Sequence, residues 1–174
     1  ATGEGGPPKH TGARRLALAA WNGVERSLGI PYPVLFPSAW LKIFAAAAHA
    51  DVVVAHDALY LTSVVGFLAA RWRGRPFLAI QHIGIVPYRS PLLSALMTAA
   101  NQLIARPILS RADQTVFISE LTLRHFEKLR WRRRPPLLIF NGVDTDMFRP
   151  PANPADASSA RERFALPAAG PIAL

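Results

Sequence analysis

The sequence predicts an α/β fold in which a parallel sheet has helices on both faces. From Asp51 onward, short apolar runs alternate with helix-length segments, which is the pattern of strand–helix–strand units. The runs are apolar at successive positions instead of alternating with polar residues, as expected for strands that helices cover on both sides. The chain has 174 residues, of which 51% are hydrophobic and 18% charged, so it is long enough for one domain with an ordinary core.

The segment before Asp51 is expected to contribute little to the sheet. Residues 1–12 are rich in glycine and proline and predict a flexible entry segment. Leu16, Ala20 and Val24 recur at helical spacing and predict a helix over residues 13–28. The prolines that follow predict an extended connection, and a second helix is expected over residues 39–48.

The strands and helices of the sheet are assigned from the alternating runs. Four strands are predicted, at residues 52–55, 77–80, 115–118 and 137–140. Helices are predicted between them, at residues 58–72, 91–110 and 120–130. Asp57 and Ser119 are suitable N-caps, and Ser90 precedes Pro91 at a first helical position, so local chemistry agrees with these boundaries.

The end of the chain is expected to leave this domain. The domain is assigned to residues 13–150, and the Pro- and Ala-rich stretch 151–169 predicts a linker with a short helix near residues 160–164. Residues 170–174 resemble the start of another strand. The chain is therefore expected to be truncated at both ends.

Polar residues follow each predicted strand. Because ligands of open parallel sheets bind beyond the carboxyl ends of the strands, these residues form one candidate rim. They are His56 and Asp57; Gln81, His82 and Gly84, with Arg89 further along the same loop; Ser119 and Glu120; and Asn141, Gly142 and Asp144.

Each rim residue also has a structural explanation. Helix capping is the favoured role of Asp57 and Ser119, and a tight turn is the favoured role of Asn141-Gly142. For His82, membership of a site is favoured over a purely structural role, whereas His56 is open to both. No metal site is predicted, because His56-Asp57 alone supplies too few ligands.

The composition excludes several classes of chemistry. The chain has no cysteine, which excludes disulfides, thiolate metal sites and cysteine nucleophiles. The most apolar stretch, residues 92–109, is interrupted by polar residues and predicts a helix packed on the sheet instead of a membrane span. The net charge of +9 is compatible with binding to nucleic acid or to an anionic membrane surface. The choice between these two partners depends on where the basic residues lie.

Two basic clusters carry much of that charge. Each follows a predicted helix and precedes a strand, which places it at the sheet edge opposite the rim. The favoured role of these clusters is structural, because positive charge at a helix C-terminus is stabilising. The alternative role is a surface patch that contacts an anionic membrane. The clusters are Arg71, Arg73 and Arg75 with Trp72, and Arg130, Arg132, Arg133 and Arg134 with Trp131.

The run from Ala112 to Ser119, followed by Ile139-Phe140-Asn141-Gly142-Val143-Asp144 with Phe148 and Pro150, resembles the N-terminal domain of glycosyltransferase family 4 (group 1). The strands that lead into His56-Asp57 and into His82 are also similar to that family. The resemblance covers residues 13–174.

The resemblance implies a Rossmann-like acceptor-side domain, which is one half of a GT-B fold. It implies a retaining, metal-independent enzyme without a cofactor, which transfers sugar from a nucleotide-sugar donor to a carbohydrate or lipid-linked acceptor. His82 matches the histidine that reaches the transferred sugar. Substrate contacts are expected from the other rim residues: His56, Asp57, Gly84, Arg89, Ser119, Glu120, Asn141 and Gly142.

Other implications concern what the chain lacks. The family's first strand with its glycine-rich loop is not recognisable, and the donor-binding domain would lie beyond Leu174, so this chain alone is expected to be inactive. A GT-B sugar-nucleotide epimerase is the alternative enzyme. A basic RNA- or membrane-binding module ranks third, because the tryptophans of this chain are scattered along the sequence. No nucleic-acid partner is expected. The expected location is cytoplasmic, with peripheral attachment at the inner face of the membrane as a variant.

Overall fold

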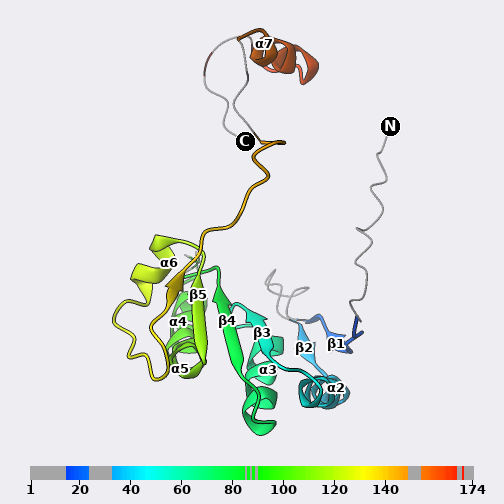
Figure 1. Cartoon of the computed structure of the whole chain (residues 1–174), viewed down its shortest axis with the longest axis vertical. Coiled ribbons are helices and arrows are strands. Elements are labelled where there is room, and N and C mark those ends of the chain that lie inside the picture. The colour runs from blue at the N-terminus through cyan, green and yellow to red at the C-terminus, as the bar shows by residue number, and fades with distance from the viewer. Residues whose placement is uncertain are drawn as a thin grey trace. The chain divides into compact units, whose positions relative to one another are not determined.

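The computed structural model describes residues 15–23, 33–84, 86, 88, 90–148, 154–167 and 170. The chain divides into two compact units, Ala1–Phe140 and Asn141–Leu174. The first unit contains the parallel sheet and its helices, and the second contains one described helix (Figure 1). Each unit is described by itself.

A four-stranded parallel sheet forms the centre of the first unit (Figure 1). Its strands are β3 (Val53–His56), β4 (Phe77–Gln81), β5 (Gln114–Phe117) and β6 (Leu137–Leu138), and they lie side by side in that order. All three pairings are parallel, so the carboxyl ends of the strands share one edge. The predicted sheet is confirmed, with strand limits shifted by one or two residues.

Helical segments connect these strands, and some of the helices begin at a serine N-cap. Helix α3 (Leu61–Trp72) joins β3 to β4, and α6 (Glu120–His125) follows β5. Between β4 and β5, α4 (Pro91–Ala100), the π-helical segment η1 (Asn101–Ala105) and α5 (Arg106–Arg111) are consecutive. The Ser90 hydroxyl accepts a hydrogen bond from the Leu93 N–H at 3.4 Å, and Ser119 caps α6 in the same way.

The core lies between the sheet and these helices. In-register partners share a face of a parallel sheet, and the buried face carries Ala55, Ala79 and Phe117. Phe67 of α3 meets the Phe77 ring edge-on at 5.2 Å, and the Phe126 ring stacks on Phe117 at 5.6 Å. Both contacts hold helical segments against the same side of the sheet.

The opposite face of the sheet is more open. It carries Val54, Leu78, Ile80 and Leu137, and the Val54 and Leu137 residues are 46% and 47% exposed. The strand order follows the sequence order, and right-handed crossovers in such an arrangement all lie on one side. The helices that connect β3 to β6 therefore cover one face of the sheet, where the sequence predicted helices on both faces. The parallel sheet with its connecting helices confirms the α/β fold class.

The C-terminal half of the continuous helix from α4 to α5 belongs to this core. Residues Pro91–Arg111 are long and apolar enough to cross a membrane by length and composition alone, which a core helix of a soluble domain also satisfies. Its Ala105, Ile108 and Leu109 are buried within the hydrophobic core cluster. The prediction of a helix packed on the sheet is confirmed for η1 and α5, whereas α4 has no buried residue.

The segment before the sheet differs from the prediction. Residues 15–22 form no helix: β1 (Ala20–Trp21) pairs antiparallel with β2 (Val34–Leu35). The helix predicted over 13–28 is therefore wrong in this part, and residues 24–28 lie outside the described residues. Backbone pairing with a segment beyond the prolines overrides the local helical spacing. Helix α2 (Pro37–Ala48) follows, and its Ala39 packs with Leu35 and with Val65 of α3.

The second unit also departs from the expected boundaries. Helix α7 (Pro154–Arg163) begins before the helix predicted near residues 160–164, so much of the expected linker is helical. In the first unit, helix α6 also differs from its predicted length: it ends at His125, because the chain turns there and buries Phe126 completely. The strand expected at residues 170–174 lies outside the described residues except for Gly170, which has φ +92°.

Candidate functional site

Two histidines from neighbouring strands meet at the carboxyl edge of the sheet. His56 ends β3, and His82 follows directly after β4. The His56 Nδ1 and His82 Nε2 atoms are 2.9 Å apart, and the ring centroids are 5.1 Å apart. A hydrogen bond between two imidazoles needs one N–H donor and one bare nitrogen, so at least one ring is neutral in this arrangement.

Asp57 fixes the backbone that carries His82. Its Oδ1 atom accepts hydrogen bonds from the backbone N–H groups of His82 at 2.8 Å and Ile83 at 3.0 Å. Asp57 has φ +58°, a left-handed conformation that aspartate tolerates better than most residues. The N-cap of α3 is Tyr60, so the predicted capping role of Asp57 is wrong. The carboxylate joins two strand ends instead.

Gln81 and Thr122 complete this support. The Gln81 residue is 3% exposed; its Oε1 accepts from the Ala58 N–H at 3.0 Å, and its Nε2 donates to the Ile83 carbonyl at 2.6 Å. The Thr122 hydroxyl donates to the His82 carbonyl at 3.3 Å. The sequence placed Gln81 at the rim, but its partners lie in other segments and carry no local signal.

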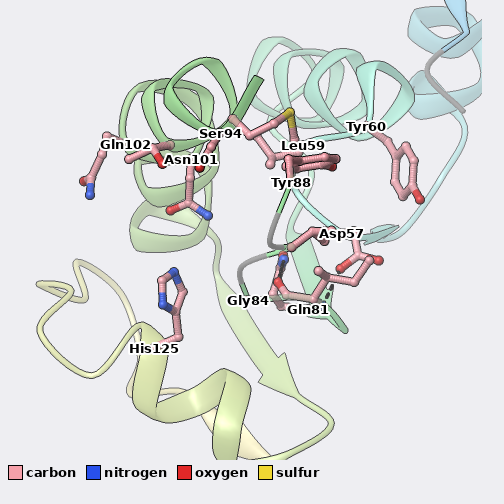
Figure 2. A pocket seen from close by; sticks show the side chains of 14 residues that line it. Asp57, Leu59, Tyr60, Gln81, Gly84, Tyr88, Ser94, Asn101, Gln102 and His125 are labelled. Atoms are coloured by element: carbon pink, nitrogen blue, oxygen red, sulfur yellow. Dashed lines mark hydrogen bonds between the residues drawn. The ribbon is translucent and has the colours of Figure 1, made fainter. Parts of the chain in front are cut away.

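A cavity of about 270 Å³ opens beside these residues, and we call it the rim cavity. It lies between the end of β4, the α4–η1 helix and the end of α6 (Figure 2). Aliphatic and aromatic side chains form much of its wall, together with a few polar groups. The lining residues are Asp57, Leu59, Tyr60, Gln81, Ile83, Gly84, Val86, Tyr88, Ser94, Met97, Thr98, Asn101, Gln102 and His125.

His125 lines this cavity, although it is not among the rim residues predicted from the sequence. Its Nε2 atom is buried and has no hydrogen-bond partner among the described residues. Burial, and then the positive charge of Arg106, lower the pKa of His125 below its usual value, so the ring is neutral near pH 7. A Cβ atom on Gly84 would lie 3.4 Å from the His125 Cβ and Cγ atoms, so glycine leaves room for this ring.

The predicted site residues of the first unit fall into separate groups. Asp57 and Gly84 line the rim cavity, and His56 and His82 form the adjacent pair. Ser119 caps α6, and its hydroxyl lies 2.9 Å from that of Thr122. Glu120 forms an exposed ion pair with Arg124 at 3.0 Å. Arg89 lies outside the described residues.

Asn141 and Gly142 belong to the second unit and are exposed. The chain makes no turn at Asn141-Gly142, and neither residue has a positive φ, so the tight turn predicted there is wrong. The turn comes just after them, at Asp144, whose Oδ1 accepts from the N–H groups of Asp146 and Met147, both at 3.0 Å.

The basic clusters lie at the other edge of the sheet, as predicted. Arg71 donates to the Asp113 carboxylate at 2.9 Å, and Arg133 lies 3.9 Å from it; Asp113 directly precedes β5. Trp131 packs on the Phe117 ring at 5.9 Å, whereas Trp72 is 79% exposed. The two clusters therefore do not form one Trp-and-Arg surface, which weakens the reading as an RNA-binding platform.

No group of three or more His, Asp or Glu residues that could hold a metal ion occurs among the residues that the structure describes.

Comparison with known proteins agrees with this architecture. The family model described as Glycosyltransferase Family 4 matches residues 3–147. A search of curated proteins found no match. Among solved structures, the chain is similar to HepE of Anabaena, crystallised in complex with UDP, with 20% sequence identity and a TM-score of 0.54. The match covers 74% of this chain and 32% of HepE, so the chain spans about a third of that protein's length. The parallel sheet is thus that of a GT-B glycosyltransferase, and the chain belongs to Glycosyltransferase Family 4.

Proposed function

We propose that this chain is the acceptor-side domain of a retaining, metal-independent glycosyltransferase that uses a nucleotide-sugar donor. The observation that carries the proposal is the family match over residues 3–147 together with the polar edge formed by His56, Asp57 and His82. The donor-binding domain would be supplied elsewhere in the same protein. HepE, which the fold resembles, was crystallised with UDP, and this supports a nucleotide-linked donor.

In the proposed reaction, the bond between the anomeric carbon and the diphosphate oxygen breaks, and the diphosphate leaves with the electron pair. The acceptor hydroxyl bonds to the anomeric carbon and loses its proton to the departing phosphate. Positive charge develops on the sugar meanwhile, so a polar group fixed beside it stabilises the transition state more than the ground state.

His82 is the proposed catalytic residue, because its backbone is held at N–H and carbonyl and its ring stands at the sheet edge. The Nε2 atom of that ring is hydrogen-bonded to His56, so Nδ1 is the nitrogen that can form a hydrogen bond with the sugar. Asp57, Gln81 and Thr122 act as positioning residues. Preorganisation of this kind is what makes a single hydrogen bond effective in catalysis.

The acceptor is proposed to be a carbohydrate or a lipid-linked carbohydrate, reached from the cytoplasmic side. Trp72, which is exposed beside Arg73, is the aromatic side chain of the basic clusters that we propose for peripheral membrane contact. An anionic surface attracts such a patch, and its position away from the rim would leave the site open.

The test is a sugar-transfer assay on a protein that contains this chain and its donor-binding domain, with a panel of nucleotide-sugars and EDTA present. Donor-dependent transfer with retained anomeric configuration supports the proposal. Release of an epimerised sugar-nucleotide, with no acceptor product, would instead identify the epimerase. The 174-residue chain alone serves as the negative control.

A further inference from the structure

A second cavity lies at the amino edge of the sheet, opposite the rim, and we call it the amino-edge cavity. Its volume of about 530 Å³ lies within the range of ~300–1,000 Å³ typical of small-molecule sites. It is formed where β3, β4 and β5 begin, together with the connection from α6 to β6. Its lining includes Val52, Pro76, Leu78, Asp113, Arg133 and Arg134.

Backbone contacts fix the segment that carries the two arginines of this cavity. Just before them, the Arg132 N–H donates to the Ser110 carbonyl at 2.9 Å. Just after them, the Pro135 carbonyl accepts from the Gln114 Nε2 atom at 2.9 Å. Figure 1 shows this connection running from α6 to the end of the sheet where β5 begins. Because both ends are anchored, less conformational entropy is lost when the segment binds a ligand.

The two arginines have little to neutralise them inside the protein. Asp113 is the acid of the cavity wall, and its carboxylate already accepts from the Arg71 guanidinium and the Phe77 N–H, both at 2.9 Å. Arg133 lies 3.9 Å from the same carboxylate, which is longer than a hydrogen bond. Arg134 forms no hydrogen bond or ion pair with the described residues. Two guanidinium groups are therefore left for a ligand.

Stabilisation of a helix end does not explain these two arginines. Arg71 is in the last turn of α3, where positive charge is favourable. Helix α6 ends at His125, so Arg133 and Arg134 lie outside its last turn, where the effect of the helix dipole is confined. This corrects the structural role predicted for this part of the second basic cluster.

An apolar surface lies beside the arginines. Val52 is 48% exposed just before β3, and Pro76 and Leu78 line the same cavity at the start of β4. Leu78 belongs to the more open face of the sheet. An inorganic phosphate would leave these side chains in water, whereas an apolar group attached to the phosphate would cover them favourably.

A pair of arginines suits a phosphate ester better than a carboxylate. A guanidinium group presents paired N–H donors that match the oxygen atoms of either anion. A phosphate monoester carries about two negative charges near neutral pH and three acceptor oxygens, so it can bind both arginines at once. A carboxylate carries a single charge and would leave the second arginine without a counterion.

We propose that the amino-edge cavity binds a phosphate ester, whose phosphate lies between Arg133 and Arg134 and whose apolar group packs on the exposed wall at Val52. The headgroup of an anionic lipid and a soluble phosphorylated compound share this chemistry. The cavity lies at the sheet edge opposite His56 and His82, so the inference does not depend on the proposed sugar transfer.

The test is isothermal titration calorimetry on the 174-residue chain at fixed ionic strength, with hexyl phosphate as the probe. Inorganic phosphate, hexanoate and hexanol each lack part of the proposed ligand. Hexyl phosphate should bind more tightly than any of these three. Arg133→Gln and Arg134→Gln should each weaken its binding by about three- to tenfold, because charged hydrogen bonds that are partly exposed to water are lost.

Matched controls remove the same charge elsewhere. Arg15 and Arg130 are exposed and lie outside the cavity wall, so Arg15→Gln and Arg130→Gln should leave binding nearly unchanged. Val52→Ser tests the apolar half of the site, since it should weaken hexyl phosphate and leave inorganic phosphate unaffected. Thermal unfolding is measured for every variant, so that a loss of binding is judged on folded chains.

Vesicle sedimentation distinguishes the two sources of the phosphate. The vesicles are phosphatidylcholine with and without phosphatidic acid, whose headgroup is a phosphate monoester. Sedimentation that requires phosphatidic acid and is lost when Arg133→Gln and Arg134→Gln are combined identifies a lipid headgroup. Binding of hexyl phosphate without sedimentation identifies a soluble phosphate ester. Either result supports the site.

Absence of hexyl phosphate binding to the folded wild-type chain overturns the inference, as does equal or tighter binding of inorganic phosphate, hexanoate or hexanol. Losses in Arg15→Gln and Arg130→Gln equal to those in Arg133→Gln and Arg134→Gln also overturn it, because the attraction would then come from the net charge of the chain. These outcomes do not depend on whether the protein transfers sugar.

Discussion

The Nδ1 atom of His56 lies 2.9 Å from the Nε2 atom of His82, although the residues are 26 positions apart in the chain. The contact follows from the parallel pairing of β3 with β4, in which His56 is opposite Ile80 and both strands end at the same edge. His56 thereby orients the His82 ring and leaves the Nδ1 atom of that ring without a partner among the described residues.

Replacing His82 tests its catalytic role. In a protein that contains both GT-B domains, we expect His82→Ala to lower kcat by about one to three orders of magnitude with little change in Tm, because the hydrogen bond forms mainly in the transition state. Both quantities are measured on the same preparation. An unchanged kcat in a well-folded variant would remove His82 from the site.

Replacing His56 tests whether it positions His82. His56→Phe keeps a ring but cannot hydrogen-bond, so His82 loses the partner that fixes its orientation. We expect kcat to fall by about tenfold or less with KM for the donor nearly constant, a smaller loss than for His82→Ala. His56→Asn retains a side chain that can hydrogen-bond and should recover part of the rate. A loss equal to that of His82→Ala would show that His56 contacts the substrate itself.

Replacing Asp57 separates its structural role from ligand binding. Asp57→Ala leaves the His82 and Ile83 N–H groups without a partner and puts alanine at φ +58°, so we expect the free energy of unfolding to fall by about 1–3 kcal/mol. Asp57→Asn keeps an acceptor oxygen and tolerates this φ, so it should cost less than about 1 kcal/mol. Urea unfolding measures both variants. Equal stability of Asp57→Ala and wild type would contradict the anchoring role.

Much of the fold could be predicted because its signals are local. The apolar runs of β3, β4 and β5 and the Ser90 and Ser119 caps lie within single segments, and all appear in the structure. The β1–β2 pairing could not be predicted, since Ala20 pairs with Leu35 across a proline-rich stretch. Helical spacing around Leu16 therefore predicted a helix that residues 15–22 do not form.

The site was only partly predictable for the same reason. The rule that parallel strands place their ends together located His56, Asp57 and His82. It carried no information on residues inside helices. Asn101 belongs to a π-helical turn with no sequence signature, and His125 ends a helix that was expected to continue. Their meeting in one cavity depends on packing between elements far apart in the sequence.

The two tryptophans of the basic clusters should differ in their effect on stability. Trp131 is partly buried and packs on Phe117 of the core, so we expect Trp131→Ala to lower the free energy of unfolding by about 1–3 kcal/mol. Trp72 is 79% exposed, and Trp72→Ala should stay within about 0.5 kcal/mol of wild type. Chemical denaturation compares the pair. Similar losses for both variants would contradict the packing described for Trp131.

Asp113 should make the stability of the sheet depend on acid pH. Partial burial alone would raise the pKa of Asp113, but the N–H of Phe77 and the charges of Arg71 and Arg133 outweigh it, so the pKa in the folded chain is below the ordinary 3.8. The folded state therefore holds the carboxylate charged where the unfolded chain would protonate it. The stabilisation is fully present well above pH 3.8 and is lost as the pH falls through the lowered pKa.

In Asp113→Asn this contribution is absent at every pH, so we expect the stability difference from wild type to be largest near neutral pH and to shrink on acidification. Urea unfolding of both proteins between pH 7 and the acid limit of folding measures it. The Glu120→Gln variant, which removes an exposed ion pair, is the control and should track wild type throughout. A constant difference between Asp113→Asn and wild type would show that Asp113 acts through its shape and hydrogen bonds without its charge.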